Sequence, residues 1–168
     1  LTDTGFEPVT SDPDAQYAQS YVVDGQAIEP LVALPHRLDN TKKASEVGDI
    51  RIDQAVIGTC CHGRIEDLEI AAAILKGKQV HPDVRFYIAP ASWEIYRKAI
   101  DDGLLATLID AGVMIQHPSC GLCVGFQAVL APGERCIAAA PRNFKGRMGS
   151  PDAEIYVASP ATVAASAV

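Results

Sequence analysis

Short apolar runs alternate with helical patterns from Ile50 to the C-terminus, and this alternation constrains the fold more than any other feature of the chain. The apolar runs predict strands at 55–58, 84–88, 113–115, 136–140 and 155–158. The patterns between them predict helices at 65–76, 92–102, 104–110 and from Ser159 onward. Alternating strands and helices are typical of an α/β fold, in which helices flank a mostly parallel sheet.

The helix ends carry recognisable signals. Ser92 and Ser159 suit N-cap positions, and Pro160 suits the first helical position. Gly77 and Gly103 suit the left-handed conformation that ends a helix. The last helix has no comparable stop before Val168, so we expect a C-terminus that has been cut.

The first 47 residues follow a different pattern, because four prolines and several turn-forming residues interrupt short apolar pieces. They predict an irregular segment with one or two short strands, at 21–23 and 31–34. The first ten residues lack the basic start and the apolar stretch of a signal peptide. We therefore expect a cytoplasmic protein.

The charge balance narrows the classes of partner. Fourteen Lys and Arg against 21 Asp and Glu give a net charge of −7. Nucleic acids and anionic membranes attract positive surfaces, so neither is an expected partner. No apolar run of about 18 residues predicts a membrane span.

Five cysteines stand out in a chain with no secretion signal, and an odd number disfavours a disulfide scaffold. Cys60 follows the predicted strand 55–58, and Cys120 and Cys123 follow the strand 113–115. Ligands of open α/β sheets bind beyond the carboxyl ends of the strands. We therefore expect these three thiols at one edge. Cys60 also precedes a helix start, where the helix dipole favours the thiolate that binds metals.

The C-x-x-C pair formed by Cys120 and Cys123 has three interpretations: two buried thiols, a redox pair, or ligands of a metal or an iron–sulfur cluster. Cys60 as a third thiol favours ligation. A structural zinc site would need a fourth ligand, such as His62 or His117. In a [4Fe–4S] cluster, three thiols would leave one iron open as a Lewis acid, which suits dehydration chemistry.

A basic loop follows the predicted strand 136–140. Arg142, Lys145 and Arg147 place three cations within six residues of an otherwise acidic chain. Arginine binds carboxylates with two parallel hydrogen bonds. The loop is either a solvated surface segment or, because it lies at the same edge as the cysteines, a binding site for a substrate carboxylate.

Together these segments resemble the aconitase family over nearly the whole chain. The motifs that carry the resemblance occur in the family's order: Ile57-Gly-Thr-Cys60, Gly63-Arg-Ile-Glu-Asp-Leu68, Cys120-Gly-Leu-Cys-Val-Gly125, Ala131-Pro-Gly-Glu-Arg135, Arg142-Asn-Phe-Lys-Gly-Arg147 and Ser159-Pro-Ala161. Within the family they are most similar to the branch that isomerises 3-isopropylmalate and 2-isopropylmalate in leucine biosynthesis. Homoaconitate, aconitate or a methyl-substituted malate are alternative substrates.

The resemblance implies an aconitase-type iron–sulfur domain. In it Cys60, Cys120 and Cys123 hold a [4Fe–4S] cluster with one open iron, and Arg142 and Arg147 bind substrate. It implies a hydro-lyase that removes and re-adds water on a hydroxy-carboxylic acid. The family's serine base lies on a swivelling domain or a small partner subunit, and its His and Asp groups lie in preceding domains. No residue here matches them, so we expect an incomplete active site.

The same resemblance divides the chain at residue 48, with 1–47 as the remnant of a preceding domain and a linker and 48–168 as the cluster-bearing domain. Two departures stand beside the expected site: Cys61-His62 replaces Thr-Asn, and Pro141 replaces Asn. They leave a non-catalytic metal-binding domain as a further alternative. We expect Cys61 to be a packed or solvent-facing thiol and Cys136 to be a core residue.

Overall fold

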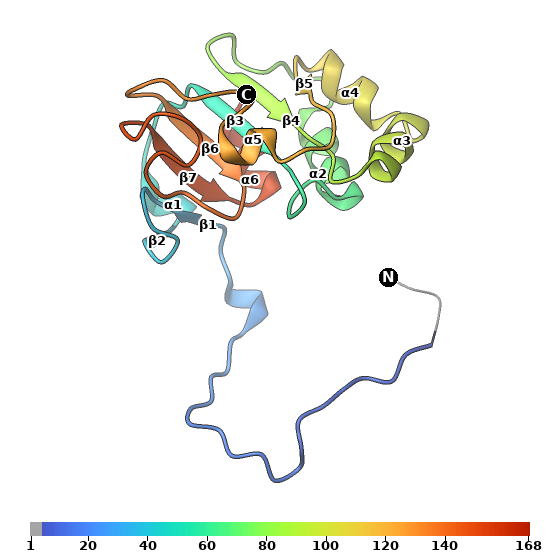
Figure 1. The fold of residues 1–168 in the computed structure, drawn as a ribbon, viewed down its shortest axis with the longest axis vertical. Helices are drawn as coiled ribbons and strands as arrows, with labels where there is room; N and C mark the ends of the chain where they lie inside the picture. Colours follow the sequence, from blue (N-terminus) through green and yellow to red (C-terminus); the bar gives the residue numbers. More distant parts are fainter. Residues whose placement is uncertain (1–4) are drawn as a thin grey trace.

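A single sheet of seven strands organises the protein, whose computed structural model describes residues 5–168 (Figure 1). Its order is β2-β1-β7-β6-β3-β4-β5. The strands are β1 (Leu31–Ala33), β2 (Thr41–Lys43), β3 (Gln54–Ile57), β4 (Arg85–Ile88), β5 (Met114–Ile115), β6 (Arg135–Ala139) and β7 (Glu154–Ala158). The five strands from β7 to β5 pair in parallel, whereas β1 is antiparallel to both β2 and β7. The predicted mostly parallel α/β sheet is confirmed.

The central strands end at the same level. Ile57, the last residue of β3, pairs with Ile88 of β4 on one side and with Ala139 of β6 on the other. Ile88 in turn pairs with Ile115 of β5. The loops that follow these strands therefore leave the sheet side by side, at the edge where the sequence predicted the candidate site.

Most of the helices cover one face of the sheet, whereas the short helix α5 and loops cover the other. The helices are α1 (Ala44–Val47), α2 (Ile65–Leu75), α3 (Trp93–Asp101), α4 (Leu104–Asp110), α5 (Gly121–Val124) and α6 (Pro160–Ser166). Leu68 of α2 and Val163 of α6 join Ile57 in the larger buried cluster. On the opposite face Leu122 of α5 and Met148 pack with smaller side chains of β3, β6 and β7.

The predicted helix signals act as expected. The Ser92 Oγ accepts a hydrogen bond from the Ile95 amide at 3.2 Å, and the Ser159 Oγ accepts one from the Thr162 amide at 3.2 Å. Gly77 follows α2 with φ +74°, and Gly103 follows α3 with φ +73°. These caps supply hydrogen-bond partners to helix ends that would otherwise lack them.

The segment before residue 48 is only partly as predicted. Leu31–Ala33 forms β1, but residues 21–23 form no strand, and β2, whose three side chains are all exposed, was not predicted. Residues 31–47 join the sheet through β1 and β2, while the boundary at residue 48 stays a prediction. Residues 1–4 of the predicted remnant lie outside the described part.

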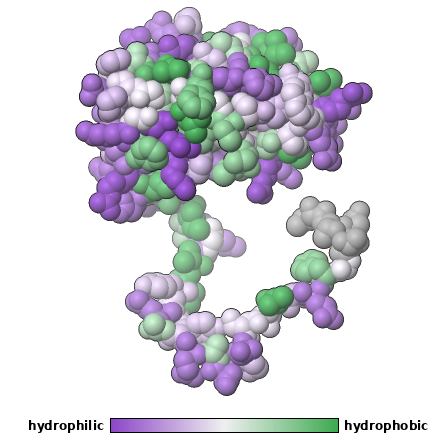
Figure 2. Space-filling model, viewed as in Figure 1, coloured by the Kyte–Doolittle hydropathy of each residue, from purple (hydrophilic) through white to green (hydrophobic). Residues whose placement is uncertain are grey.

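Residues 5–30, which we call the arm, run away from the sheet and its helices (Figure 1). Several large apolar or aromatic side chains along the arm are exposed: Phe6, Val9, Tyr17, Tyr21, Val22, Val23 and Ile28. Green patches along the arm in Figure 2 mark hydrophobic residues at its surface. Within residues 5–168, every helix is too short or too polar to cross a lipid bilayer.

The turn before β6 is held by one carboxylate. Glu134 accepts hydrogen bonds from the Ala131 amide at 2.7 Å and from the Arg85 Nη2 at 2.8 Å. The Arg85 hydrogen bond lowers the pKa of Glu134, and the Ala131 amide lowers it further against the opposing effect of burial. Because the folded protein binds the ionised form, this contact stabilises the fold above the ordinary carboxyl pKa and is lost as the pH falls through the lowered value.

We expect Glu134→Gln to reduce the free energy of unfolding at neutral pH by about 1 kcal/mol, since partial exposure weakens a charge-assisted contact. Urea unfolding at a series of pH values measures this. The difference from the parent chain should shrink as the parent's own carboxylate becomes protonated. Glu7→Gln on the exposed arm is the control, and an equal loss in both variants would contradict the assignment.

Candidate metal centre

The loop between β3 and α2 presents two thiols at its tip. A Cβ atom on Gly58, whose φ is +147°, would lie 2.7 Å from the Ala89 carbonyl oxygen, and one on Gly63 would collide with the same oxygen. The Ala91 amide donates to the Gly63 carbonyl at 2.8 Å. Only glycine permits this close approach, so the loop is held at both ends.

Cys60 and Cys61 lie between these two glycines and are both exposed. Their Sγ atoms are 3.9 Å apart. The sequence suggested that Cys60 lies at the start of a helix. In the structure Arg64 occupies the N-cap of α2, so Cys60 lies on the loop before the helix. The field of a helix dipole falls off within the first turn of the helix. The expected link between Cys60 and the start of α2 is therefore not supported by the structure.

Cys120 and Cys123 lie on α5, a short helix where the sequence predicted a loop. Cys120 is the exposed N-cap residue, and Cys123 is buried one turn later. The helix ends at Gly125, which has φ +73° and packs so closely on Met148 that a Cβ atom would lie 2.6 Å from the Met148 carbonyl carbon. The close packing fixes α5 against the basic loop.

One predicted arginine lies at this centre. The Arg147 Nη2 donates to the Cys123 Sγ at 3.0 Å, and its guanidinium carbon lies 5.6 Å from the centroid of the Phe144 ring. The Arg147 Nε is buried and has no hydrogen-bond partner among the described residues. A cation is therefore aimed at a sulfur of the predicted ligand set.

The two cysteine loops lie within electrostatic reach of each other. The pKa of Cys61 is raised, first by its hydrogen bond with Cys60, then by burial and by the charges of Cys60 and Cys123. The charge of Arg64 acts in the opposite direction. A sulfur on α5 thus influences a sulfur on the loop after β3, as parallel strands that end at one edge would require.

Other predicted residues are not brought together. Within residues 5–168, no three His, Cys, Asp or Glu side chains form a group that could hold a metal ion. Arg142 is exposed and donates from Nη1 to the neighbouring Pro141 carbonyl at 2.8 Å. It lines a hollow with residues 36–39, Asn143 and Phe144, and neither Arg147 nor a candidate cysteine lines that hollow.

Two buried amides tie segments that follow the candidate residues back to the sheet, and neither was predicted from the sequence. The Gln54 Nε2 donates to the Ala128 carbonyl at 3.0 Å and so ties β3 to the segment after α5. The Asn143 Nδ2 donates to the Leu34 carbonyl at 2.9 Å and ties the basic loop to the end of β1. The sequence marked the first of these contacts only by placing a polar glutamine, Gln54, at the start of an apolar strand.

Cys136 is a core residue, as predicted. It is fully buried in β6, and burial raises the pKa of its thiol to about 12. At neutral pH a thiol of this kind is neither a nucleophile nor a ready metal ligand.

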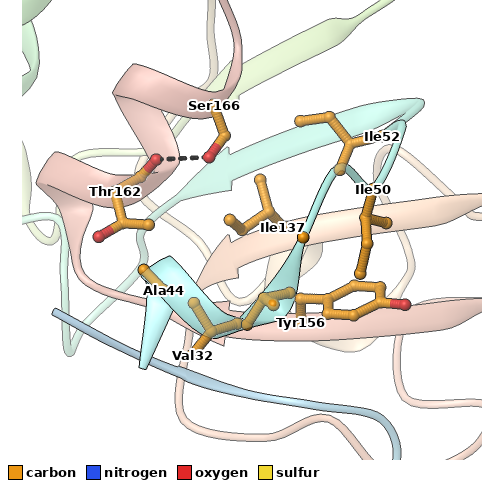
Figure 3. A pocket seen from close by; sticks show the side chains of 10 residues that line it. Val32, Ala44, Ile50, Ile52, Ile137, Tyr156, Thr162 and Ser166 are labelled. Atoms are coloured by element: carbon orange, nitrogen blue, oxygen red, sulfur yellow. Dashed lines mark hydrogen bonds between the residues drawn. The ribbon is translucent and has the colours of Figure 1, made fainter. Parts of the chain in front are cut away.

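A separate apolar cavity of about 120 Å³ lies on the helical face of the sheet (Figure 3). Its labelled side chains come from β1, α1, the segment before β3, β6, β7 and α6: Val32, Ala44, Ile50, Ile52, Ile137, Tyr156, Thr162 and Ser166. None of the candidate cysteines or arginines lines it. The candidate centre therefore lies at the loop edge, apart from this cavity.

The family model of the aconitase family (aconitate hydratase) matches residues 36–168, which include strands β2 to β7 and the three segments that carry the candidate cysteines and arginines. The chain belongs to the aconitase family. Proteins of this family use an iron–sulfur cluster, which agrees with the thiol donors found at the edge.

Relatives in this family are closely similar along nearly the whole chain. The 3-isopropylmalate dehydratase large subunit of Moorella thermoacetica is 52% identical over 159 residues, which are 94% of this chain and 38% of the relative. The protein of the same name from Syntrophus aciditrophicus is 53% identical over the same shares of each chain. The large subunit 1 from Thermotoga maritima is 49% identical over 97% of this chain and 40% of its own. The chain thus spans about two fifths of these curated relatives.

The exposure of the thiols predicts their order of alkylation in the native protein. We expect N-ethylmaleimide to modify Cys60, Cys61 and Cys120 rapidly, Cys123 more slowly and Cys136 only after unfolding. Tryptic peptides quantified over time measure this, with the urea-unfolded protein as the control. Native modification of Cys136 at the rate of Cys60 would contradict the assignment.

Proposed function

We propose that this chain is the cluster-bearing part of a hydro-lyase that isomerises 3-isopropylmalate and 2-isopropylmalate by dehydration and rehydration in leucine biosynthesis. The observation that carries the proposal is the contact between Arg147 and Cys123 at the edge shared with Cys60. Support comes from the dehydratase large subunits, whose sequences are about half identical to this one.

Cys60, Cys120 and Cys123 are the proposed ligands of a [4Fe–4S] cluster that has one open iron. They fit such a group in donor type, since thiolates are the usual ligands of iron–sulfur clusters. In position the fit is partial: two are exposed and all three follow strands that end at one edge, but within residues 5–168 the three thiols do not form a group that could hold a metal ion. When bound, a cluster of this kind supplies a Lewis-acidic iron for the substrate's hydroxyl and carboxylate.

The residues of this chain bind and orient the acid. A guanidinium forms paired hydrogen bonds with a carboxylate, and Arg147 already faces the candidate ligand set. Arg142 is the proposed second contact, from the same loop. Asn143 holds that loop against β1 with its buried amide, so the arginines are presented by a fixed backbone.

Proton transfer is assigned to other parts of the active site. The proposed partners are a small subunit with a swivelling domain, which agrees with the large-subunit names of the relatives, and the preceding domains of a longer polypeptide. This division assigns substrate binding and water activation, but not the base, to residues 48–168.

Cluster loading tests the ligand set directly. We expect anaerobic reconstitution with iron and sulfide to give a brown protein, and Cys60→Ser, Cys120→Ser and Cys123→Ser each to lose most of the visible absorbance and bound iron. Cys61→Ser is the matched control on the same loop and should load like the parent. A Cys123→Ser variant that keeps a full cluster, or a colourless parent with stoichiometric zinc, would refute the ligand set.

Substrate binding tests the arginine. We expect Arg147→Gln to weaken the binding of 3-isopropylmalate to the cluster-loaded chain by about 10- to 100-fold, since a charged hydrogen bond contributes about 1.5–3 kcal/mol. Calorimetry measures the affinity without requiring turnover, and homoaconitate and aconitate serve as competing acids. Arg97→Gln, an exposed arginine on α3, is the control; equal affinities in the two variants would remove Arg147 from the site.

A further inference from the structure

Cys61 has no part in the proposed function, yet it lies beside one of the proposed ligands. Its Sγ atom is 3.9 Å from the Sγ atom of Cys60, and both side chains are exposed. Gly58 and Gly63 hold the loop on either side by their close approach to the Ala89 carbonyl oxygen. The two thiols are therefore presented together, to solvent, on a loop whose ends are fixed.

We propose that Cys60 and Cys61 form an oxidisable dithiol, a modification site for small-molecule disulfides such as oxidised glutathione. The Cys60 thiolate attacks one sulfur of the reagent, forms a mixed disulfide and displaces one glutathione thiolate. The Cys61 thiolate then attacks the Cys60 sulfur, closes an intramolecular disulfide and displaces the second glutathione. The protein loses two electrons and two protons, and the reagent is reduced to two thiols.

The spacing suits this second step. A disulfide needs the sulfurs about 2.05 Å apart, so side-chain rotation must close the 3.9 Å gap between two already neighbouring atoms. Adjacent Cα atoms are about 3.8 Å apart, below the usual range for bridged cysteines, so the ring is strained. Strained disulfides are readily reduced again, which makes the modification reversible.

The other thiols are less suited to the reaction. Cys120 is exposed, but Cys123, the other member of its pair, is buried against Arg147, and Cys136 lies inside β6. An oxidant in solution therefore meets the Cys60–Cys61 pair before it meets a pair that includes Cys123. One consequence rests on the proposed function: while its sulfur is in the disulfide, Cys60 is withdrawn from the cluster ligands.

The test uses the full chain without a cluster, so its result is independent of iron binding. The reduced protein is treated with oxidised glutathione, blocked with N-ethylmaleimide and digested with trypsin. Cleavage after Arg51 and Arg64 isolates both thiols on the peptide 52–64, whereas peptides 99–135 and 136–142 carry the other three. We expect the peptide 52–64 to lose two hydrogens, to take up no maleimide and to regain both thiols with dithiothreitol.

The Cys61→Ser variant separates the two steps. It should keep one glutathione on Cys60 after the same treatment, because no neighbouring thiol can displace it. Cys136→Ala is the control and should behave like the parent. The proposal is overturned by a peptide 52–64 that still takes up two maleimides, by a parent that keeps glutathione like the variant, or by a disulfide that links two chains.

Discussion

The level pairing of the central strands is the constraint on which the rest of the structure depends. Ile57 of β3 is hydrogen-bonded in register between β4 and β6, and β5 continues the same level on the far side of β4. Parallel strands that end together deliver their following loops to one edge, whatever the loops contain. Backbone pairing therefore directs cysteines that lie about sixty residues apart, and a basic loop further on, to the same edge of the sheet.

The sequence was informative wherever one local rule decided the structure. Buried runs became β3, β4 and β6, and Ser92 and Ser159 capped their helices, because burial and capping act over a few residues. The α5 helix was missed, since four residues between turn formers carry no periodic pattern. The β1–β2 hairpin was missed in part, because the side chains of β2 are all exposed and only its pairing with β1 defines it.

The candidate site shows the same division. The residue types and their strand-end positions were readable, and the structure adds the contact of Arg147 with Cys123. The sequence did not show that Arg147 contacts Cys123 whereas Arg142 donates to the Pro141 carbonyl. This difference depends on how the loop turns at Pro141. Gln54 and Asn143 were also hidden, since their partners are backbone carbonyls far away in the sequence. A polar residue beside an apolar run marks such a position at most, and the sequence does not show which distant carbonyl it contacts.

The unequal covering of the two sheet faces has a thermodynamic consequence. The helical face carries the larger apolar cluster, whereas α5 and its neighbours rest on a cluster of fewer buried side chains. Local opening costs less free energy where fewer apolar contacts are broken, so amide hydrogens of α5 should exchange with solvent before those of β3. A ligand that binds only the closed form of such a segment stabilises it by mass action. Ligand binding at this edge and the order of the loops that cover it therefore depend on each other. The helical face keeps its structure independently of that ligand.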